Sequence, residues 1–168
     1  MDEMYLERKK QKKIDMADLA NLFHSTLFSL ERAIQETSGN TSMIVTSHAC
    51  KFLDKIEEKK ASKMFTSGNL EEAIDNFIEF TSGSDFFEHV EFKKINEEEY
   101  LFEIKGCALA KSGVHDTLNP EKDICPIALV AGALLKYYNQ NSDVIVEPSK
   151  FTSMDIENRI YCIKLGSG

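Results

Sequence analysis

The sequence predicts an α+β fold, in which N-terminal helices pack on a four-stranded antiparallel sheet and a buried helix lies in the C-terminal half. The first observation is a change of period. Apolar residues recur at three- and four-residue steps up to about residue 80, then alternate with polar residues from about residue 86. The second is an apolar run after Cys125 that has helical length and almost no polar face, which is typical of a buried helix.

Length and composition indicate one globular domain. The chain has 168 residues, enough for a single core, and its net charge of -8 disfavours nonspecific binding to nucleic acid. No apolar run approaches the ~20 residues that span a bilayer, and the first residues lack the apolar core of a signal peptide. We therefore expect a cytoplasmic protein with reduced cysteines and with neither membrane nor nucleic acid as a partner.

The domain is expected to span residues 15–165, after a basic and flexible N-terminal segment at residues 1–14. Its first helix, predicted over residues 15–36, carries one broad stripe at helical spacing. The stripe consists of Met16, Leu19, Leu22, Phe23, Thr26, Leu27, Leu30, Ala33 and Ile34. Such a face can be core throughout, or half core and half a dimer contact.

Two further helices are predicted before the sheet, over residues 41–64 and 69–80. Turn-forming serine, glycine and asparagine residues separate each helix from the one before it. Asn69, followed three residues later by Glu72, is a capping-box variant that marks the start of the later helix.

Two alternating runs, over residues 86–93 and 99–105, predict an antiparallel hairpin, because a short polar connection joins them. Their apolar positions are Phe86, Val90 and Phe92 in the first run and Tyr100, Phe102 and Ile104 in the second. The alternation predicts a sheet with one face buried and the other in contact with solvent.

The last part of the chain adds a helix over residues 125–139 and two strands over residues 143–147 and 159–165. Pro126 suits the first position of this helix, because a proline there sacrifices no helical hydrogen bond. Pro148 ends the first of the two strands.

The candidate site is the stretch from Cys107 to Cys125, which contains two of the four cysteines and one of the four histidines, His115. Thiolate and imidazole ligands together suit borderline-soft metals, zinc first among them. Cys125 falls at the start of a helix, where the dipole lowers the pKa of a thiol and favours the thiolate. Gly113 and Pro120 allow the intervening loop to fold back, so that the three ligands can converge.

A closed zinc site needs a fourth ligand. Cys162 is the strongest candidate, because the last strand of such a sheet often lies beside the hairpin, and Asp123 and Asp116 are the oxygen alternatives. Other interpretations stay open. Cys125 can be a reactive thiol, the cysteines can be buried in the core, or three of them can bind an iron–sulfur cluster, although its usual short spacings are missing.

From Phe86 to Leu165 the elements and cysteines follow a known order. A hairpin leads to a cysteine-bearing loop, then to Cys125-Pro126 and a helix rich in small residues, and finally to a strand with a late cysteine, Cys162. This order resembles the 4-vinyl reductase domain family, in particular its stand-alone archaeal members described as hydrocarbon-binding proteins. The N-terminal helices agree with that family in number and order only.

The resemblance implies a fold similar to the trafficking-complex and haem/nitric-oxide-associated ligand domains. It also implies binding of small hydrophobic molecules, often by a dimer with a zinc site that supports the pocket. In aromatic-sensing regulators of this kind, the zinc ligands include a cysteine at the start of the last helix and one in the final strand, here Cys125 and Cys162. The glutamate and cysteine that complete the set there have no match in this chain, so Cys107 and His115 would replace them.

We therefore predict a homodimeric, zinc-supported sensor or carrier domain that binds a small hydrophobic molecule. The predicted zinc ligands are Cys107, His115, Cys125 and Cys162, and the predicted pocket walls are Phe23, Leu27, Phe52, Phe77, Phe102, Leu134 and Tyr138. Two alternatives remain: a redox enzyme or reductase subunit with a metal or iron–sulfur centre, and an interaction module that dimerises through its first helix. No phosphate loop or hydrolase motif assigns a reaction, which favours a protein that is not an enzyme.

Overall fold

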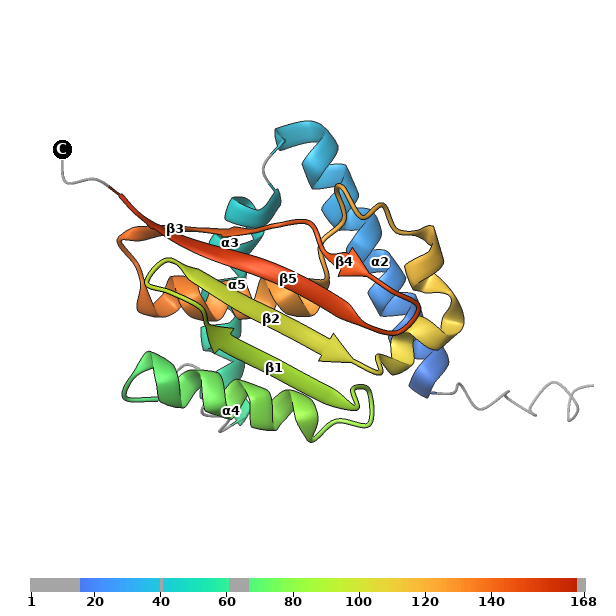
Figure 1. Cartoon of the computed structure of the whole chain (residues 1–168), viewed down its shortest axis with the longest axis horizontal. Coiled ribbons are helices and arrows are strands. Elements are labelled where there is room, and N and C mark those ends of the chain that lie inside the picture. Colours follow the sequence, from blue (N-terminus) through green and yellow to red (C-terminus); the bar gives the residue numbers. More distant parts are fainter. Residues whose placement is uncertain (1–15, 40, 61–66, 166–168) are drawn as a thin grey trace, which may run out of the picture.

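A computed structural model of the chain describes residues 16–39, 41–60 and 67–165 and confirms the α+β class (Figure 1). The helices are α2 (Met16–Ser38), α3 (Thr41–Lys60), α4 (Leu70–Ser82) and α5 (Pro126–Tyr138), with two 3₁₀ helices, η1 (Ala108–Ser112) and η2 (Val114–Thr117). The strands are β1 (His89–Lys94), β2 (Glu99–Lys105), β3 (Ser142–Val146), β4 (Lys150–Phe151) and β5 (Ile156–Lys164). The predicted N-terminal segment at 1–14 and the predicted end of the second helix at 61–64 lie outside the described residues.

Two helix starts confirm the chemistry predicted for them. Asn69 accepts a hydrogen bond at Oδ1 from the backbone N–H of Glu72 (2.9 Å), and the carboxylate of Glu72 accepts one from the N–H of Gly68 (3.2 Å). Pro126 occupies the first turn of α5, with Cys125 as its cap residue. Local sequence therefore determines where α4 and α5 begin.

The last strand, β5, lies at the centre of the sheet. It pairs antiparallel with β2 on one side and with β3 on the other, so that the order is β1-β2-β5-β3. The short β4 also pairs with β5 and brings the sheet to five strands instead of the predicted four. The prediction misses β4 because Pro148 interrupts the edge strand and only Lys150 and Phe151 pair beyond it.

The predicted strand over residues 86–93 is wrong at its start, since β1 begins at His89. Residues 83–88 instead connect α4 to β1, and the carbonyl oxygen of Phe86 accepts a hydrogen bond from the N–H of Ala108 (2.7 Å). The apolar character of Phe86 and Phe87 therefore needs a reason other than strand alternation, and the cleft described below supplies it.

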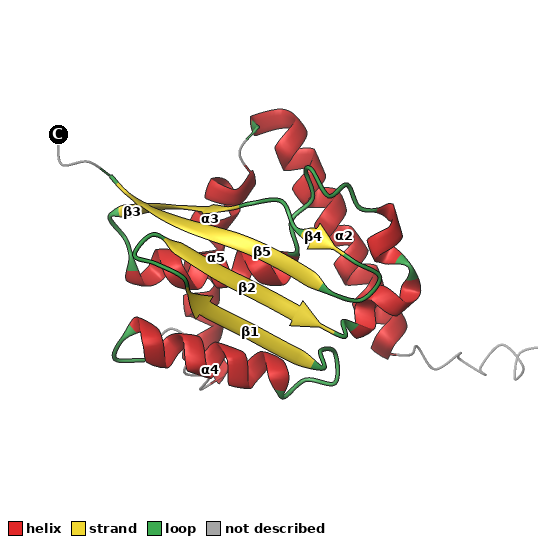
Figure 2. Cartoon of the chain, viewed as in Figure 1, coloured by secondary structure: helices red, strands yellow, loops and turns green. Residues whose placement is uncertain are grey.

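The helices cover one face of the sheet, and Figure 2 shows the strands in front of α3 and α5 in this view. Tyr100, Phe102 and Ile104 of β2 are buried on the covered face, whereas the residues between them stay partly exposed. The core lies between this face and α5, of which seven of the 13 residues are buried. The predicted burial of this helix is thus confirmed.

A glycine allows α5 to pack closely against two neighbours. A Cβ atom on Gly132 would lie 2.7 Å from Cγ2 of Val146 in β3 and 2.9 Å from Cγ2 of Thr46 in α3. Both distances are too short for a carbon contact, so α3, α5 and β3 can approach this closely only because position 132 carries no side chain.

Helix α2 has a different environment from the other helices. It lies beside the end of the sheet and packs against η1, α3 and α5, close to the long loop that joins β2 to α5 (Figure 1). Across the described ranges, no helix combines the length and the apolar character needed to cross a membrane.

Candidate functional site

Helix α2 turns most of its apolar stripe toward solvent. Its large apolar side chains with an exposed fraction of about half or more are Leu22, Phe23, Leu27 and Leu30. The face that packs against the protein carries His24, Phe28 and Glu31 instead, and each is at most 5% exposed. The stripe is therefore not core throughout, and the polar residues of α2 lie on the buried side.

The seven predicted pocket residues do not line a common cavity. Tyr138 is half-buried and donates its hydroxyl hydrogen bond to the carbonyl oxygen of Ser67 (2.8 Å), while the side chain of Phe52 lies outside the described part of the chain. The exposed members are Phe23 and Leu27, and the members of the closed core are Phe77, Phe102 and Leu134. Periodicity identified apolar positions, but it did not separate core from cavity wall.

An apolar cleft of about 870 Å³ lies elsewhere, where the end of α4 meets α2, η1 and α5. Its walls are Ala20, Asn76, Glu79, Phe80, Thr81, Gly83, Ser84, Phe86, Phe87, Leu109 and Ile127. Three of these are phenylalanines from α4 and the connection that follows it. Phe80 is 64% exposed, so a large part of its aromatic ring is in contact with solvent at the cleft. The sequence feature that marks this cleft is the presence of phenylalanines on both sides of the turn-forming residues 81–84.

The structure brings Cys107 and Cys125 together in the core, as expected of a loop that folds back between them. Burial raises the pKa of Cys125 to about 12, and the nearby Cys107 thiol raises it further, although the backbone amides of Ala128 and Ile127 oppose the shift. Burial also raises the pKa of Cys107. The predicted lowering of the Cys125 pKa is therefore wrong, because loss of hydration outweighs the helix terminus.

His115 lies next to a histidine that was not predicted as a ligand. The ring centre of His115 is 6.5 Å from that of His24 in α2 and 5.1 Å from that of Phe151 in β4. The Nδ1 atom of His115 lies 3.4 Å from the carbonyl oxygen of Thr152. The loop thus carries His115 to the buried face of α2.

Cys162 lies at the other end of the sheet. Its N–H donates to the carbonyl oxygen of Glu98, whereas the N–H of Cys107 donates to that of Met154, just before β5. The stretch of β5 from Ile156 to Cys162 alone spans roughly 20 Å. The four predicted zinc ligands therefore do not converge, and no group of three or more His, Cys, Asp or Glu suited to a metal occurs among the described residues.

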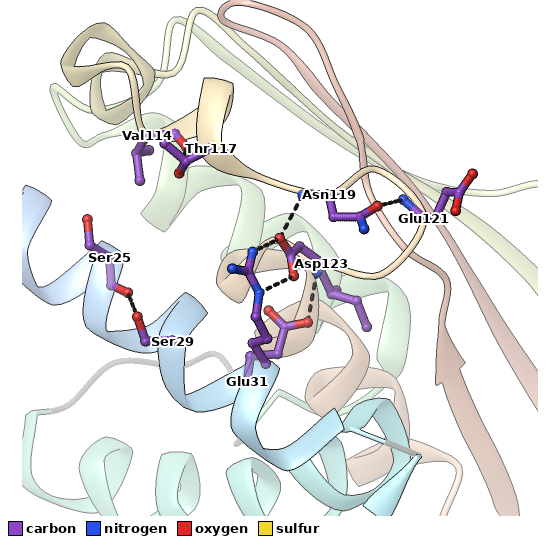
Figure 3. A network of polar contacts seen from close by, with 10 residues as sticks. Ser25, Ser29, Glu31, Val114, Thr117, Asn119, Glu121 and Asp123 are labelled. Atoms are coloured by element: carbon purple, nitrogen blue, oxygen red, sulfur yellow. Dashed lines mark hydrogen bonds and ion pairs between the residues drawn. The ribbon is translucent and has the colours of Figure 1, made fainter. Parts of the chain in front are cut away.

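The oxygen alternative Asp123 already has partners. Its carboxylate accepts hydrogen bonds from the guanidinium of Arg32 (2.5 and 3.4 Å) and from the N–H of Asn119 (2.8 Å; Figure 3). The Asp123 side chain is 2% exposed and that of Arg32 is 48% exposed, so this ion pair joins the loop to the rim of α2. Asp116, the other oxygen alternative, is exposed in η2.

Glu31 is the second link between α2 and the loop. One carboxyl oxygen accepts a hydrogen bond from the N–H of Ile124 (2.8 Å; Figure 3), whereas Oε2 is buried and has no hydrogen-bond partner. Burial raises the pKa of Glu31 to about 8, nearby Asp123 adds to the increase, and the bond from Ile124 opposes it. At neutral pH the carboxyl group is therefore mostly protonated.

The buried polar atoms without partners are concentrated in one region. Among the described residues they are Nε2 of His24, Oε2 of Glu31 and Nε2 of His115. All three lie where α2 meets the loop between β2 and α5. Each such atom costs about 1–3 kcal/mol, so their clustering marks this contact as a functional candidate.

Neither His24 nor Glu31 is among the site residues predicted from the sequence. The signal that reveals them is the spacing of 24, 28, 31 and 35, which forms a second stripe on the same helix. The sequence matches no family model and no curated protein. The resemblance to the 4-vinyl reductase domain family therefore stays a prediction, and the functional inference depends on geometry.

Proposed function

We propose that this protein binds a small apolar molecule in the cleft between α4, α2, η1 and α5. The observation that carries the proposal is the cleft itself, whose volume of about 870 Å³ falls in the range of small-molecule sites and whose walls are mainly apolar. Phe80, Phe86 and Phe87 contribute large apolar surfaces to the walls, and these surfaces would leave water when a ligand binds.

Three polar wall residues, Asn76, Glu79 and Thr81, come from α4, and a fourth, Ser84, follows directly after this helix. Leu109 and Ile127 come from η1 and α5. This arrangement favours a ligand whose body is apolar and whose polar groups, if it has any, face α4. A protein that binds such a molecule without converting it would act as a sensor or a carrier.

The experiment uses the neutral fluorophore N-phenyl-1-naphthylamine, whose emission rises in apolar surroundings. We expect saturable binding to the unmodified protein and at least tenfold weaker binding to Phe80→Glu and Phe86→Glu, because each places a carboxylate at the cleft. Both residues are exposed, so the variants should fold. Ile95→Glu, at an exposed site away from the cleft, is the control. Equal binding by all four proteins would sink the proposal.

Zinc remains the metal that the sequence predicts, but its predicted ligand set does not fit this structure. Cys107 and Cys125 lie together, yet Cys162 is at the far end of β5 and His115 faces α2. The proposed function therefore depends on the cleft and not on a zinc-supported wall. The redox alternative has no specific observation in its favour.

A specific observation does favour the second candidate, an interaction module that dimerises through α2. Leu22, Phe23, Leu27 and Leu30 are exposed along one side of the helix. Ile34 continues this side and, with Ile44 and Val45 of α3, lines a shallow apolar hollow. Contiguous apolar surface of this kind is typical of a protein contact. A homodimer can coexist with ligand binding, because the apolar cleft lies on other residues.

A further inference from the structure

Two buried histidines lie opposite each other between α2 and η2. The ring centres of His24 and His115 are 6.5 Å apart, with an angle of 40° between the ring planes. Each residue is 5% exposed, and the Nε2 atom of each is buried without a hydrogen-bond partner. The apolar cleft does not include either residue among its walls.

The neighbouring backbone determines which nitrogen of His115 carries the proton. The carbonyl oxygen of Thr152, 3.4 Å from Nδ1, can only accept a hydrogen bond, so the proton belongs on Nδ1 and Nε2 keeps its lone pair. A histidine that donates one ring N–H to a backbone carbonyl and offers the other nitrogen as a lone pair has the arrangement of a metal ligand.

Aromatic side chains surround the pair and supply no hydrogen bond to it. Phe28 contacts His24 edge-on at 4.8 Å between ring centres, and Phe151 lies 5.1 Å from His115 and 6.0 Å from Phe28. Burial lowers the pKa of His24 to about 4, with His115 adding to the decrease, and burial also lowers the pKa of His115. Both rings are therefore neutral at physiological pH, which is the form that binds metals.

The separation of the rings suits a bridging ion. Two metal–nitrogen bonds of about 2.0–2.1 Å place two imidazole ring centres roughly 5–6.5 Å apart, with the larger value for a nearly linear arrangement. We propose that His24 and His115 bind a copper(I) ion through their Nε2 atoms, because copper(I) accepts two imidazole ligands in a nearly linear arrangement. Imidazole nitrogen also suits zinc(II), but zinc is almost always four-coordinate, and the neighbouring Phe28 and Phe151 add no ligand.

This site differs from the predicted zinc site in its donors and in its location. Only His115 is common to both, and Cys107 and Cys125 interact with each other in the core. It is also independent of the proposed ligand cleft. A bridging water molecule is the competing occupant, because water can donate to two lone pairs at once.

The test measures metal affinity by competition with chromophoric chelators, bicinchoninate for copper(I) and pyridylazoresorcinol for zinc(II), under anaerobic reducing conditions. His24→Phe and His115→Phe remove the nitrogen donors but keep an aromatic ring in the space. We expect one ion per unmodified chain and at least tenfold weaker binding to each variant. His89→Phe, at an exposed position in β1, is the matched control and should bind as the unmodified chain does. Cys107→Ala should also retain the ion.

X-ray absorption at the metal edge of the unmodified, metal-loaded protein gives a second readout, which does not depend on whether a variant folds. Two imidazole nitrogens in the coordination sphere support the site, and a spectrum dominated by sulfur overturns it. Failure of the unmodified protein to bind either metal, or equal affinity of the unmodified chain and the two His→Phe variants, also overturns it and leaves water as the occupant. Tighter binding of zinc(II) than of copper(I) would overturn the two-coordinate site as well.

Discussion

The two faces of α2 contrast sharply. The outward face carries Leu22, Phe23, Leu27 and Leu30, and the inward face carries His24, Phe28 and Glu31. In most surface helices the apolar stripe packs on the core and the polar stripe meets water. Here the distribution is reversed over much of the helix. An apolar period therefore identifies a helix and the existence of a contact face, but not which partner covers that face.

The reversed distribution bears on two proposals, the dimer contact on the outward face of α2 and the histidine site on its inward face. An outward apolar face has a use only when another surface covers it, which favours a second copy of the chain. Among the described residues, the inward face of α2 contributes two buried polar atoms without hydrogen-bond partners, on His24 and Glu31, and the facing loop contributes a third, on His115. Each such atom in a folded protein requires an explanation, and a bound ligand or ion is one.

The largest expected effect comes from removing the same side chain on opposite faces. Phe28→Ala should lower the free energy of unfolding by about 3–5 kcal/mol, because it opens a cavity among buried rings. Phe23→Ala should change it by no more than about 0.5 kcal/mol in dilute solution. Urea unfolding monitored by circular dichroism measures both. Similar losses for the two variants would contradict the assignment of faces.

A smaller effect is expected from the buried carboxyl group of the inward face. Its pKa rises from an ordinary value of 4.5 to about 8 in the folded chain, so between these pH values the unfolded chain has lost a proton that the folded chain retains. The contribution of this group to the free energy of unfolding should therefore fall as pH rises from about 4.5 to about 8, by a few kcal/mol at most, and level off above pH 8. The lowered pKa of His24 adds a contribution of opposite sign that is complete above about pH 6.5, so the fall due to Glu31 is cleanest between pH 7 and 9.

Glu31→Gln should flatten this pH dependence and make the protein more stable than the unmodified chain above pH 8. Glu36→Gln, at an exposed position on the same helix, is the control. Unfolding curves at pH 5, 7 and 9 test the prediction. A slope that survives in Glu31→Gln would show that another group carries it.

The smallest effect on folding, and the largest on association, is expected for the outward face. Leu27→Ser together with Leu30→Ser should convert a two-chain species into single chains in sedimentation velocity, while unfolding in dilute solution changes by at most about 0.5 kcal/mol. Ile95→Ser, at an exposed site elsewhere, should leave the mass unchanged. A protein that sediments as a single chain before any substitution would remove the dimer hypothesis.

Local chemistry allowed much of the fold to be predicted. The cap at Asn69, the proline at position 126 and the alternation in β2 each depend on residues adjacent in sequence, and the structure confirms all three. The short β4 was missed, because two paired residues after a proline carry no periodic signal.

The candidate site could be predicted only in part. The sequence identified Cys107, His115 and Cys125 as residues of interest, and the structure buries all three, with Cys107 and Cys125 together in the core and His115 against α2. It could not indicate that Cys162 lies at the far end of β5, because strand register depends on pairings between distant segments.

By itself, the sequence determined the α+β class, the starts of α4 and α5, and the buried character of α5, since capping, period and helix-wide apolarity act within a few residues. Only the tertiary structure decided which side of α2 faces inward, where the apolar cleft lies, and that His24 meets His115. These features depend on contacts between segments that are many residues apart in the sequence. The residues of one segment do not indicate which other segment packs against them.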